Sequence, residues 1–162
     1  MAEPAASNPA ASNPAESDTV ALFTPIPNGK VLAAVCAING LRGRVLETAA
    51  GAFAVLDDTS AGATEKAGEV ISGFVKDRPI LALERRAGQI SVTRWEAGVA
   101  REHLAPGFAL DEAPGAVVTL MTGTQTMDDL AAVHPDKVFD ARMGRIAGFR
   151  ALRKLSKQAQ RG

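Results

Sequence analysis

The sequence between residues 31 and 56 reads VLAAVCAINGLRGRVLETAAGAFAVL, and this stretch indicates the fold class. Its first part, Val31 to Ile38, is apolar and partly β-branched without alternation, which is typical of a strand covered on both faces. Arg44 to Ala50 is a short helix candidate that Gly51 would end, and Ala52 to Leu56 reads as a second buried strand. The stretch therefore predicts a small βαβ unit.

The segment that follows carries the most regular helical pattern. Residues 57–60 are Asp, Asp, Thr and Ser, which are common N-cap residues. Pro79 ends this helix, and Ile80–Arg86 with Gln89–Glu96 then reads as a hairpin that turns at Ala87-Gly88. The apolar residues that recur at helical spacing predict the buried face of the helix: Ala63, Ala67, Val70, Ile71, Phe74 and Val75.

Closer to the C-terminus, residues that interrupt secondary structure alternate with residues that begin helices. Residues 97–115 contain two prolines and three glycines and are expected to be loop, whereas residues 116–121 read as a strand. Thr126 with Asp129 resembles a capping box for a helix over residues 127–133. Pro135 suits the first turn of a terminal helix.

At the other end, Val20 to Ile26 is expected to be extended and to lie at a sheet edge, because Pro25 and Pro27 restrict it; Asn28-Gly29 is then expected to turn the chain. The element order becomes βαβαβββαα. It predicts an α/β or α+β fold, with helices packed on a small mixed sheet and an amphipathic basic helix at the C-terminus.

Composition divides the chain into three parts. Residues 1–18 hold three copies of a Pro-Ala pentapeptide without a large apolar side chain, so they are expected to be a disordered tether. Residues 19–141 form the globular body, and 162 residues leave room for one domain. We expect a soluble, cytoplasmic protein, because the chain shows neither a membrane-length apolar run nor a leader pattern.

The charge is balanced overall but unevenly distributed. The sequence has 18 basic and 18 acidic residues; residues 142–162 contain seven of the basic ones and none of the acidic ones. The terminal helix should be docked on the acidic body, with its basic residues within an arc of about 100° and Phe149 on the opposite, apolar face. These residues are the first candidate site, for an anionic or protein partner: Arg150, Arg153, Lys154, Lys157 and Arg161.

Three interpretations of the basic face remain open at this point. Cations near a helix C-terminus complement the helix dipole and need no ligand. They could also neutralise the acidic body, or they could bind phosphates or another anionic surface, including a membrane.

The second candidate site is a pocket at the ends of the two strands expected in the opening stretch. Arg42 and Arg44 follow the first strand, and Asp57 and Asp58 follow the second. If the strands were parallel, the four side chains would meet at one sheet edge, where ligands of open α/β sheets bind. The arginines would take a phosphate or carboxylate, and an aspartate would take a metal or a proton.

The sequence favours a non-catalytic binding or regulatory protein that contacts a partner through the basic helix. It contains no nucleophile elbow, Walker loop, complete dinucleotide fingerprint or Cys–His pair, so no cofactor is predicted. His103 and His134 lack paired ligand spacing, and Cys36 is expected to be buried, so no metal site is predicted either. A small enzyme or anion-binding domain that uses the strand-end pocket is the alternative, and a subunit of a homo-oligomer is a third.

Overall fold

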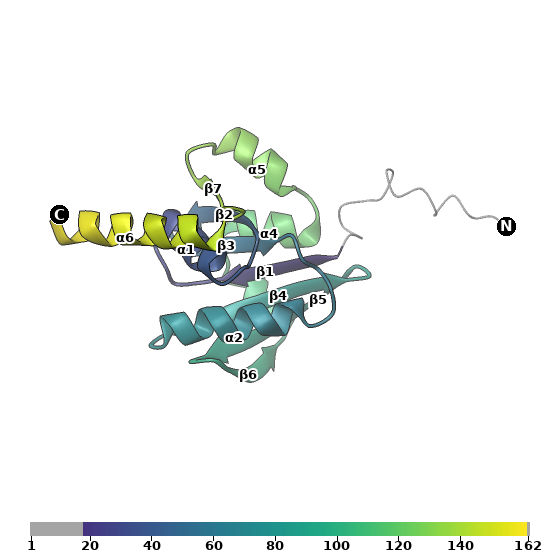
Figure 1. The fold of residues 1–162 in the computed structure, drawn as a ribbon. Coiled ribbons are helices and arrows are strands. Elements are labelled where there is room, and N and C mark those ends of the chain that lie inside the picture. Colours follow the sequence, from purple (N-terminus) through teal and green to yellow (C-terminus); the bar gives the residue numbers. More distant parts are fainter. Residues whose placement is uncertain (1–17, 162) are drawn as a thin grey trace.

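The computed structural model describes the backbone of residues 18–161 and the side chains of residues 18–158; the expected tether therefore lies outside the described residues, except for Asp18. The chain has an α+β fold, in which helices cover both faces of a seven-stranded sheet (Figure 1). In chain order the elements are β1 (Thr19–Phe23), α1 (Gly29–Ile38), β2 (Gly43–Thr48), β3 (Gly51–Leu56), α2 (Ala63–Val75), β4 (Ile80–Arg86), β5 (Gln89–Glu96), β6 (Val99–Leu104), α3 (Pro106–Asp111), α4 (Gly115–Thr122), α5 (Met127–Val133), β7 (Val138–Asp140) and α6 (Arg145–Arg161).

The sheet has the strand order β6-β5-β4-β1-β3-β2-β7, and each neighbouring pair is antiparallel. The expectation of a mixed sheet is therefore wrong. The expected edge position of the first strand is also wrong, because β1 lies at the centre between β3 and β4. Pro25 and Pro27 follow the last residue of β1, so neither interrupts the ladder.

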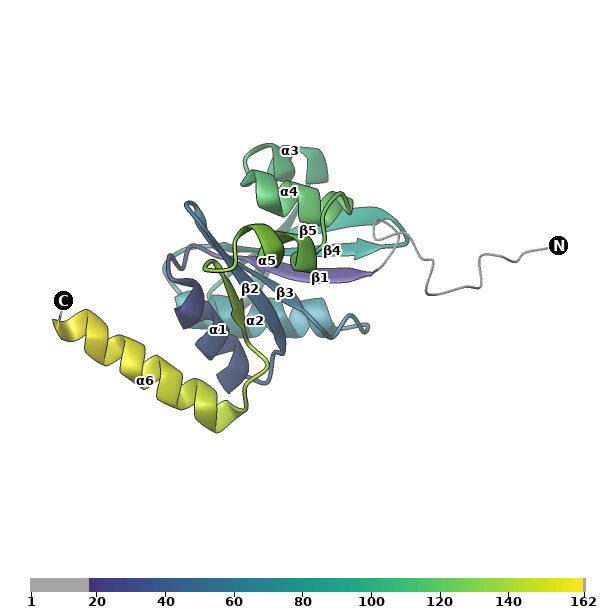
Figure 2. The ribbon, with the colours of Figure 1, turned by 90° about the horizontal axis from the view of Figure 1, so that it is seen from above.

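Helices α1 and α2 lie on one face of the sheet and α3, α4 and α5 on the other (Figure 2). Each face carries its own apolar cluster. Val20 and Leu22 of β1 belong to the cluster beneath α1 and α2, whereas Ala21 belongs to the one beneath α3, α4 and α5. Successive side chains of a strand point to opposite faces, so a central strand covered on both faces must be apolar throughout. Helix α6 forms a further layer outside α1.

The first expected strand of the opening stretch is a helix, and the expected helix after it is a strand. Val31 to Ile38 lies in helix α1, where Asn28 is the N-cap and its side chain accepts a hydrogen bond from the backbone N–H of Lys30. This segment shows no clear periodicity because the sheet covers one side of α1 and α6 covers another. A helix covered in this way has the same apolar composition as a buried strand.

Arg44 to Thr48 lies in strand β2 and not in a helix, and Ala52 to Leu56 lies in β3 as predicted. The chain turns tightly between β2 and β3, and Gly51 begins β3 with a φ of 140°. A Cβ atom at Gly51 would lie 2.0 Å from the carbonyl oxygen of Thr24. The glycine thus permits a close backbone approach at a hairpin and does not end a helix.

Three later expectations are also wrong. Residues 97–115 are not loop, since they contain β6 and α3, and residues 116–121 belong to helix α4. Pro135 does not start the terminal helix, because β7 intervenes and α6 begins at Arg145. Short apolar runs without alternation do not distinguish strand from helix, and a three-residue strand such as β7 leaves almost no sequence pattern.

The elements with distinct boundary signals are confirmed. The hairpin of β4 and β5 turns at Ala87-Gly88, and α5 has the Thr126 capping box, in which the Thr126 hydroxyl accepts from Asp129 N–H and the Asp129 carboxylate accepts from Thr126 N–H. Helix α2 is present, but its buried face is rotated from the expected one. Ile71 is fully buried, whereas Phe74 is 49% exposed.

Candidate functional site

Helix α6 packs on α1 through a close contact at Gly148. A Cβ atom at this position would lie 2.8 Å from Cβ of Ala37 and 3.1 Å from the carbonyl oxygen of Ala34. Leu152 packs against the core cluster beneath α1, and Leu155 is half-buried. The small residue at the contact allows the two backbones to approach, which fixes one side of α6 on the body (Figure 2).

The basic residues of α6 lie on its solvent side. Arg150, Arg153, Lys154 and Lys157 are exposed, and within residues 18–158 none of them forms an ion pair with an acidic side chain. Arg161 is the last residue of the helix, and its side chain lies outside the described part of the structure. The described contacts thus give no support to neutralisation of the acidic body by this face.

Two apolar side chains of α6 also face solvent. Ile146 is 72% exposed and Phe149 is 60% exposed. At about 100° per residue, Ile146 projects between Arg150 and Arg153 on the helix circumference. The pattern of the sequence predicts Phe149 opposite the basic residues, but α1 covers only the stripe that contains Gly148 and Leu152, which leaves Phe149 beside the basic arc.

A bidentate ion pair between Arg142 and Asp57 fixes the chain just before α6. The Nε and Nη2 atoms of Arg142 each donate to a carboxylate oxygen of Asp57 at 2.8 Å. The guanidinium of Arg142 lowers the pKa of Asp57, and the positive charges of Arg42 and Arg44 lower it further. The backbone N–H of Arg142 also donates to the Asp140 carboxylate at 2.7 Å. Asp57 therefore positions the entry into α6.

The four residues of the expected strand-end pocket have different partners. Arg44 forms an ion pair with Asp128 of α5 at 2.8 Å, whereas Asp57 binds Arg142. Asp58 accepts hydrogen bonds from the backbone N–H and the hydroxyl of Ser60, which lower its pKa.

The premise of two parallel strands behind this pocket is wrong, because Val31 to Ile38 belongs to helix α1 and β3 pairs with antiparallel neighbours. Arg42 and Asp58 do line one cavity, but its volume of about 40 Å³ is far below the several hundred Å³ of an ordinary ligand site.

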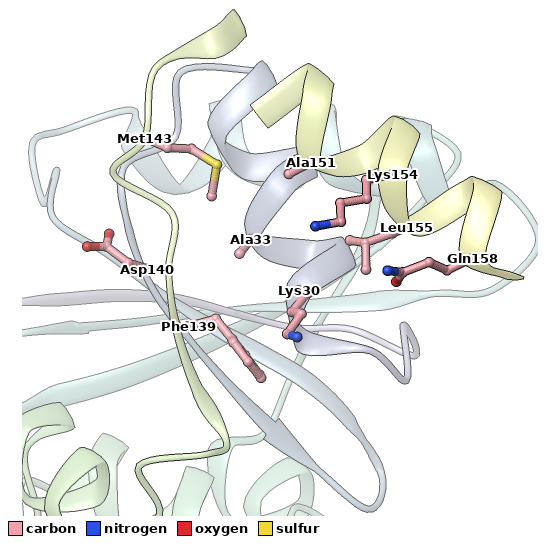
Figure 3. A pocket seen from close by; sticks show the side chains of 9 residues that line it. All are labelled: Lys30, Ala33, Phe139, Asp140, Met143, Ala151, Lys154, Leu155 and Gln158. Carbon is pink, nitrogen blue, oxygen red and sulfur yellow. The ribbon is translucent and has the colours of Figure 1, made fainter. Parts of the chain in front are cut away.

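A larger cavity lies between α1, β7 and α6, where the sequence predicts no site (Figure 3). Its volume is about 330 Å³. Its basic residues are Lys30 from α1 and Lys154 from α6, and the Lys30 ammonium lies 5.9 Å from the ring centroid of Phe139. Periodicity identifies Lys154 but not the cavity, because the cavity depends on the three-residue strand β7.

A further hollow lies between α2 and the strands β4, β5 and β6, with a volume of about 270 Å³. Thr64 donates to Glu84 at 3.1 Å, and Glu84 also forms an ion pair with Arg86. His103 Nδ1 lies 3.0 Å from the Thr93 hydroxyl. The Glu84 carboxylate and the His103 imidazole are thus occupied by neighbouring side chains.

A metal site and a reactive cysteine are two further kinds of site that the described residues do not support. Among residues 18–158, no group of three or more His, Cys, Asp or Glu side chains could hold a metal ion. Burial raises the pKa of the Cys36 thiol to about 12, so the thiol stays protonated and unreactive at neutral pH.

Within the described part of the chain, no helix combines the length and apolar character needed to cross a bilayer. Comparison of the chain with protein-family models, with curated proteins and with solved structures finds no match.

Proposed function

We propose that this protein is a non-catalytic binding protein that contacts a phosphate-bearing polyanion through the basic face of α6. The observation that carries the proposal is a helix anchored on one side by α1 that presents four cations on its other side without an acidic partner in residues 18–158. Cations that take no part in internal pairing are available to a partner.

The physical basis of the proposed contact is counterion release. Each Lys or Arg that neutralises a phosphate frees a condensed counterion, so affinity rises with each phosphate that is neutralised and falls as salt is added. A helix fixed to the body presents its cations without first having to fold, which lowers the entropic cost of binding. The helix dipole also favours cations near the C-terminal end, but this accounts for their stability and does not prevent binding.

The test compares two variants whose net charge is changed equally. One replaces Arg150, Arg153 and Lys157 with Gln and keeps Lys154, which lines the cavity. The control replaces Lys66, Lys76 and Arg78 with Gln; all three are exposed on or just after α2. Fluorescence anisotropy with a labelled single-stranded oligonucleotide at low and moderate salt gives the affinity and its salt dependence.

We expect the α6 variant to bind at least about tenfold more weakly, and its logarithmic salt slope to fall by about 0.7 for each phosphate that is no longer neutralised. The control should bind as the wild type does, and both variants should melt near the wild-type temperature, because exposed charges contribute little to stability. Undetectable binding by the wild type at low salt, or equal weakening in the control, would contradict the proposal.

A further inference from the structure

We propose that the cavity between α1, β7 and α6 binds a small amphipathic anion, a monocarboxylate with an apolar body. This site is separate from the polyanion contact proposed above: it takes a ligand of different chemistry, and the two share only Lys154. The proposal follows from the lining of the cavity, from the charges at its mouth, and from the absence of acidic partners for those charges among the described residues.

The lining of the cavity is mostly apolar. Side chains from α1, β7, α6 and the segment between β7 and α6 form it, and its 330 Å³ lies within the range of small-molecule sites. A neighbouring hollow of about 430 Å³ shares four of its lining residues and extends it toward the start of α1. The apolar residues that line the first cavity are Ala33, Phe139, Met143, Ala151 and Leu155.

Two lysines from different elements line this cavity. In Figure 3 the side chains of Lys30 and Lys154 enter the same space from α1 and α6. Within residues 18–158 neither lysine has an acidic side chain at ion-pair distance. The Phe139 ring lies close enough to Lys30 for a cation–π contact, but the ring has no net charge and does not neutralise the ammonium group.

The two acidic residues around the cavity are held by other groups. Asp140 lies at the opposite end from the lysines in Figure 3, and its carboxylate accepts the backbone N–H of Arg142. Glu47 lines the neighbouring hollow, where it accepts the backbone N–H of Gly29 at 2.8 Å and binds Lys137 at 3.3 Å. Within residues 18–158 neither carboxylate lies at ion-pair distance from Lys30 or Lys154, so the charge of the two lysines is left for a ligand.

The class of ligand follows from this combination. A purely polar anion would leave the apolar lining in contact with water, and a neutral apolar molecule would leave the two ammonium groups without a partner. A carboxylate on an aliphatic or aromatic body satisfies both, because its head can accept hydrogen bonds from Lys30 and Lys154 while its body covers Leu155 and Phe139. Lysine also suits a single compact head, since it acts as a point charge.

The experiment titrates the full chain with decanoate below its micelle concentration by isothermal titration calorimetry, and compares 1-decanol and acetate. We expect saturable binding of decanoate, at least about tenfold weaker binding of decanol, and no detectable binding of acetate. Equal affinity for decanol and decanoate would overturn the proposal, because it would show that the lysines do not recognise the head group. So would the absence of saturable decanoate binding.

Two variants locate the site. Lys30→Gln with Lys154→Gln should weaken decanoate binding at least about tenfold. The matched control, Arg150→Gln with Arg153→Gln, removes the same charge from α6 residues that do not line the cavity, and should leave the affinity unchanged. Met143→Glu places a carboxylate in the lining and should also abolish binding, with melting temperatures confirming that each variant is folded.

Equal weakening in the lysine variant and its control would overturn the site and would indicate a general charge effect. The result is also independent of the oligonucleotide experiment, in which Lys154 is kept. A protein that binds the oligonucleotide but not decanoate would overturn only this inference, and the reverse result would overturn only the polyanion proposal.

Discussion

Ile71 and Phe74 lie three residues apart on α2 and have different environments. Ile71 is fully buried against the sheet, whereas Phe74 is 49% exposed. Ile71→Ala should therefore reduce the free energy of unfolding by about 2–5 kcal/mol, since it creates a cavity in the core. Phe74→Ala should cost only about 1–2 kcal/mol, because about half of the Phe74 surface stays in contact with water in the folded protein. Urea denaturation of both variants gives the comparison, and a larger destabilisation by Phe74→Ala would contradict the helix orientation.

The Asp57–Arg142 pair should make the free energy of unfolding depend on pH in the acidic range. Because Arg142 lowers the pKa of Asp57 in the folded state, the unfolded chain binds this proton more readily. The pair therefore stabilises the protein above the ordinary aspartate pKa of about 3.9, and this contribution disappears as pH falls through the lower folded value. Both side chains are about two-fifths exposed, so its size should not exceed about 1 kcal/mol.

Asp57→Asn removes this contribution. Urea titrations should show that the variant is less stable than the wild type at pH 6 and that the difference shrinks as the pH is lowered toward about 2–3. A difference that stays constant across this range would indicate a destabilisation that does not depend on the charge of Asp57.

Among the elements, the contact of α6 with α1 depends on one position. Gly148→Ala places a Cβ atom 2.8 Å from that of Ala37, so the helices must separate or shift. We expect a destabilisation of about 1–3 kcal/mol from overpacking, which exceeds the gain of about 1 kcal/mol in helix propensity. Gly144→Ala is the control, because a Cβ there meets open space. Thermal melts should show a lower temperature for Gly148→Ala than for Gly144→Ala.

Elements with their own boundary chemistry could be predicted from the sequence. The Thr126 capping box and the Ala87-Gly88 turn fix their elements through local hydrogen bonds and backbone angles, so α5 and the β4–β5 hairpin could be identified. Helix α1 could not, because its neighbours in the fold cover it and remove the periodicity that identifies a helix.

The candidate sites likewise divide into features that local sequence determines and features that the tertiary fold determines. The basic residues of α6 recur at helical spacing within one segment, so their common face could be predicted. The exposure of Phe149 could not, because it depends on how narrow a stripe α1 covers. The cavity needs Lys30, Phe139 and Lys154 from three elements, and their proximity is a property of the tertiary fold.

At the scale of the whole molecule, α6 covers one side of α1 in addition to presenting the basic face for which we propose a binding role. Removal of residues 145–162 should expose the outer side of α1, including the surroundings of Ala34 and Ala37 that Gly148 now contacts. We expect the truncated chain to melt several degrees lower, since a domain near 150 residues melts about 2–4 °C lower for each 1 kcal/mol of destabilisation. The Gln variant of Arg150, Arg153 and Lys157 should keep the wild-type melting temperature. Equal temperatures for the truncated and full chains would contradict this role of α6.

The central place of β1 in the sheet constrains the order in which the molecule can fold. One side of β1 pairs with β3 and the other with β4, and its first residue, Thr19, pairs with Arg85. The hairpins β2–β3 and β4–β5 join residues close in sequence, whereas the partners of β1 come from both halves, and distant partners close loops slowly. Of the strands that the structure describes, β1 is therefore expected to be among the last to find its neighbours, and we expect the insertion of β1 between two preformed halves to be a late step of folding.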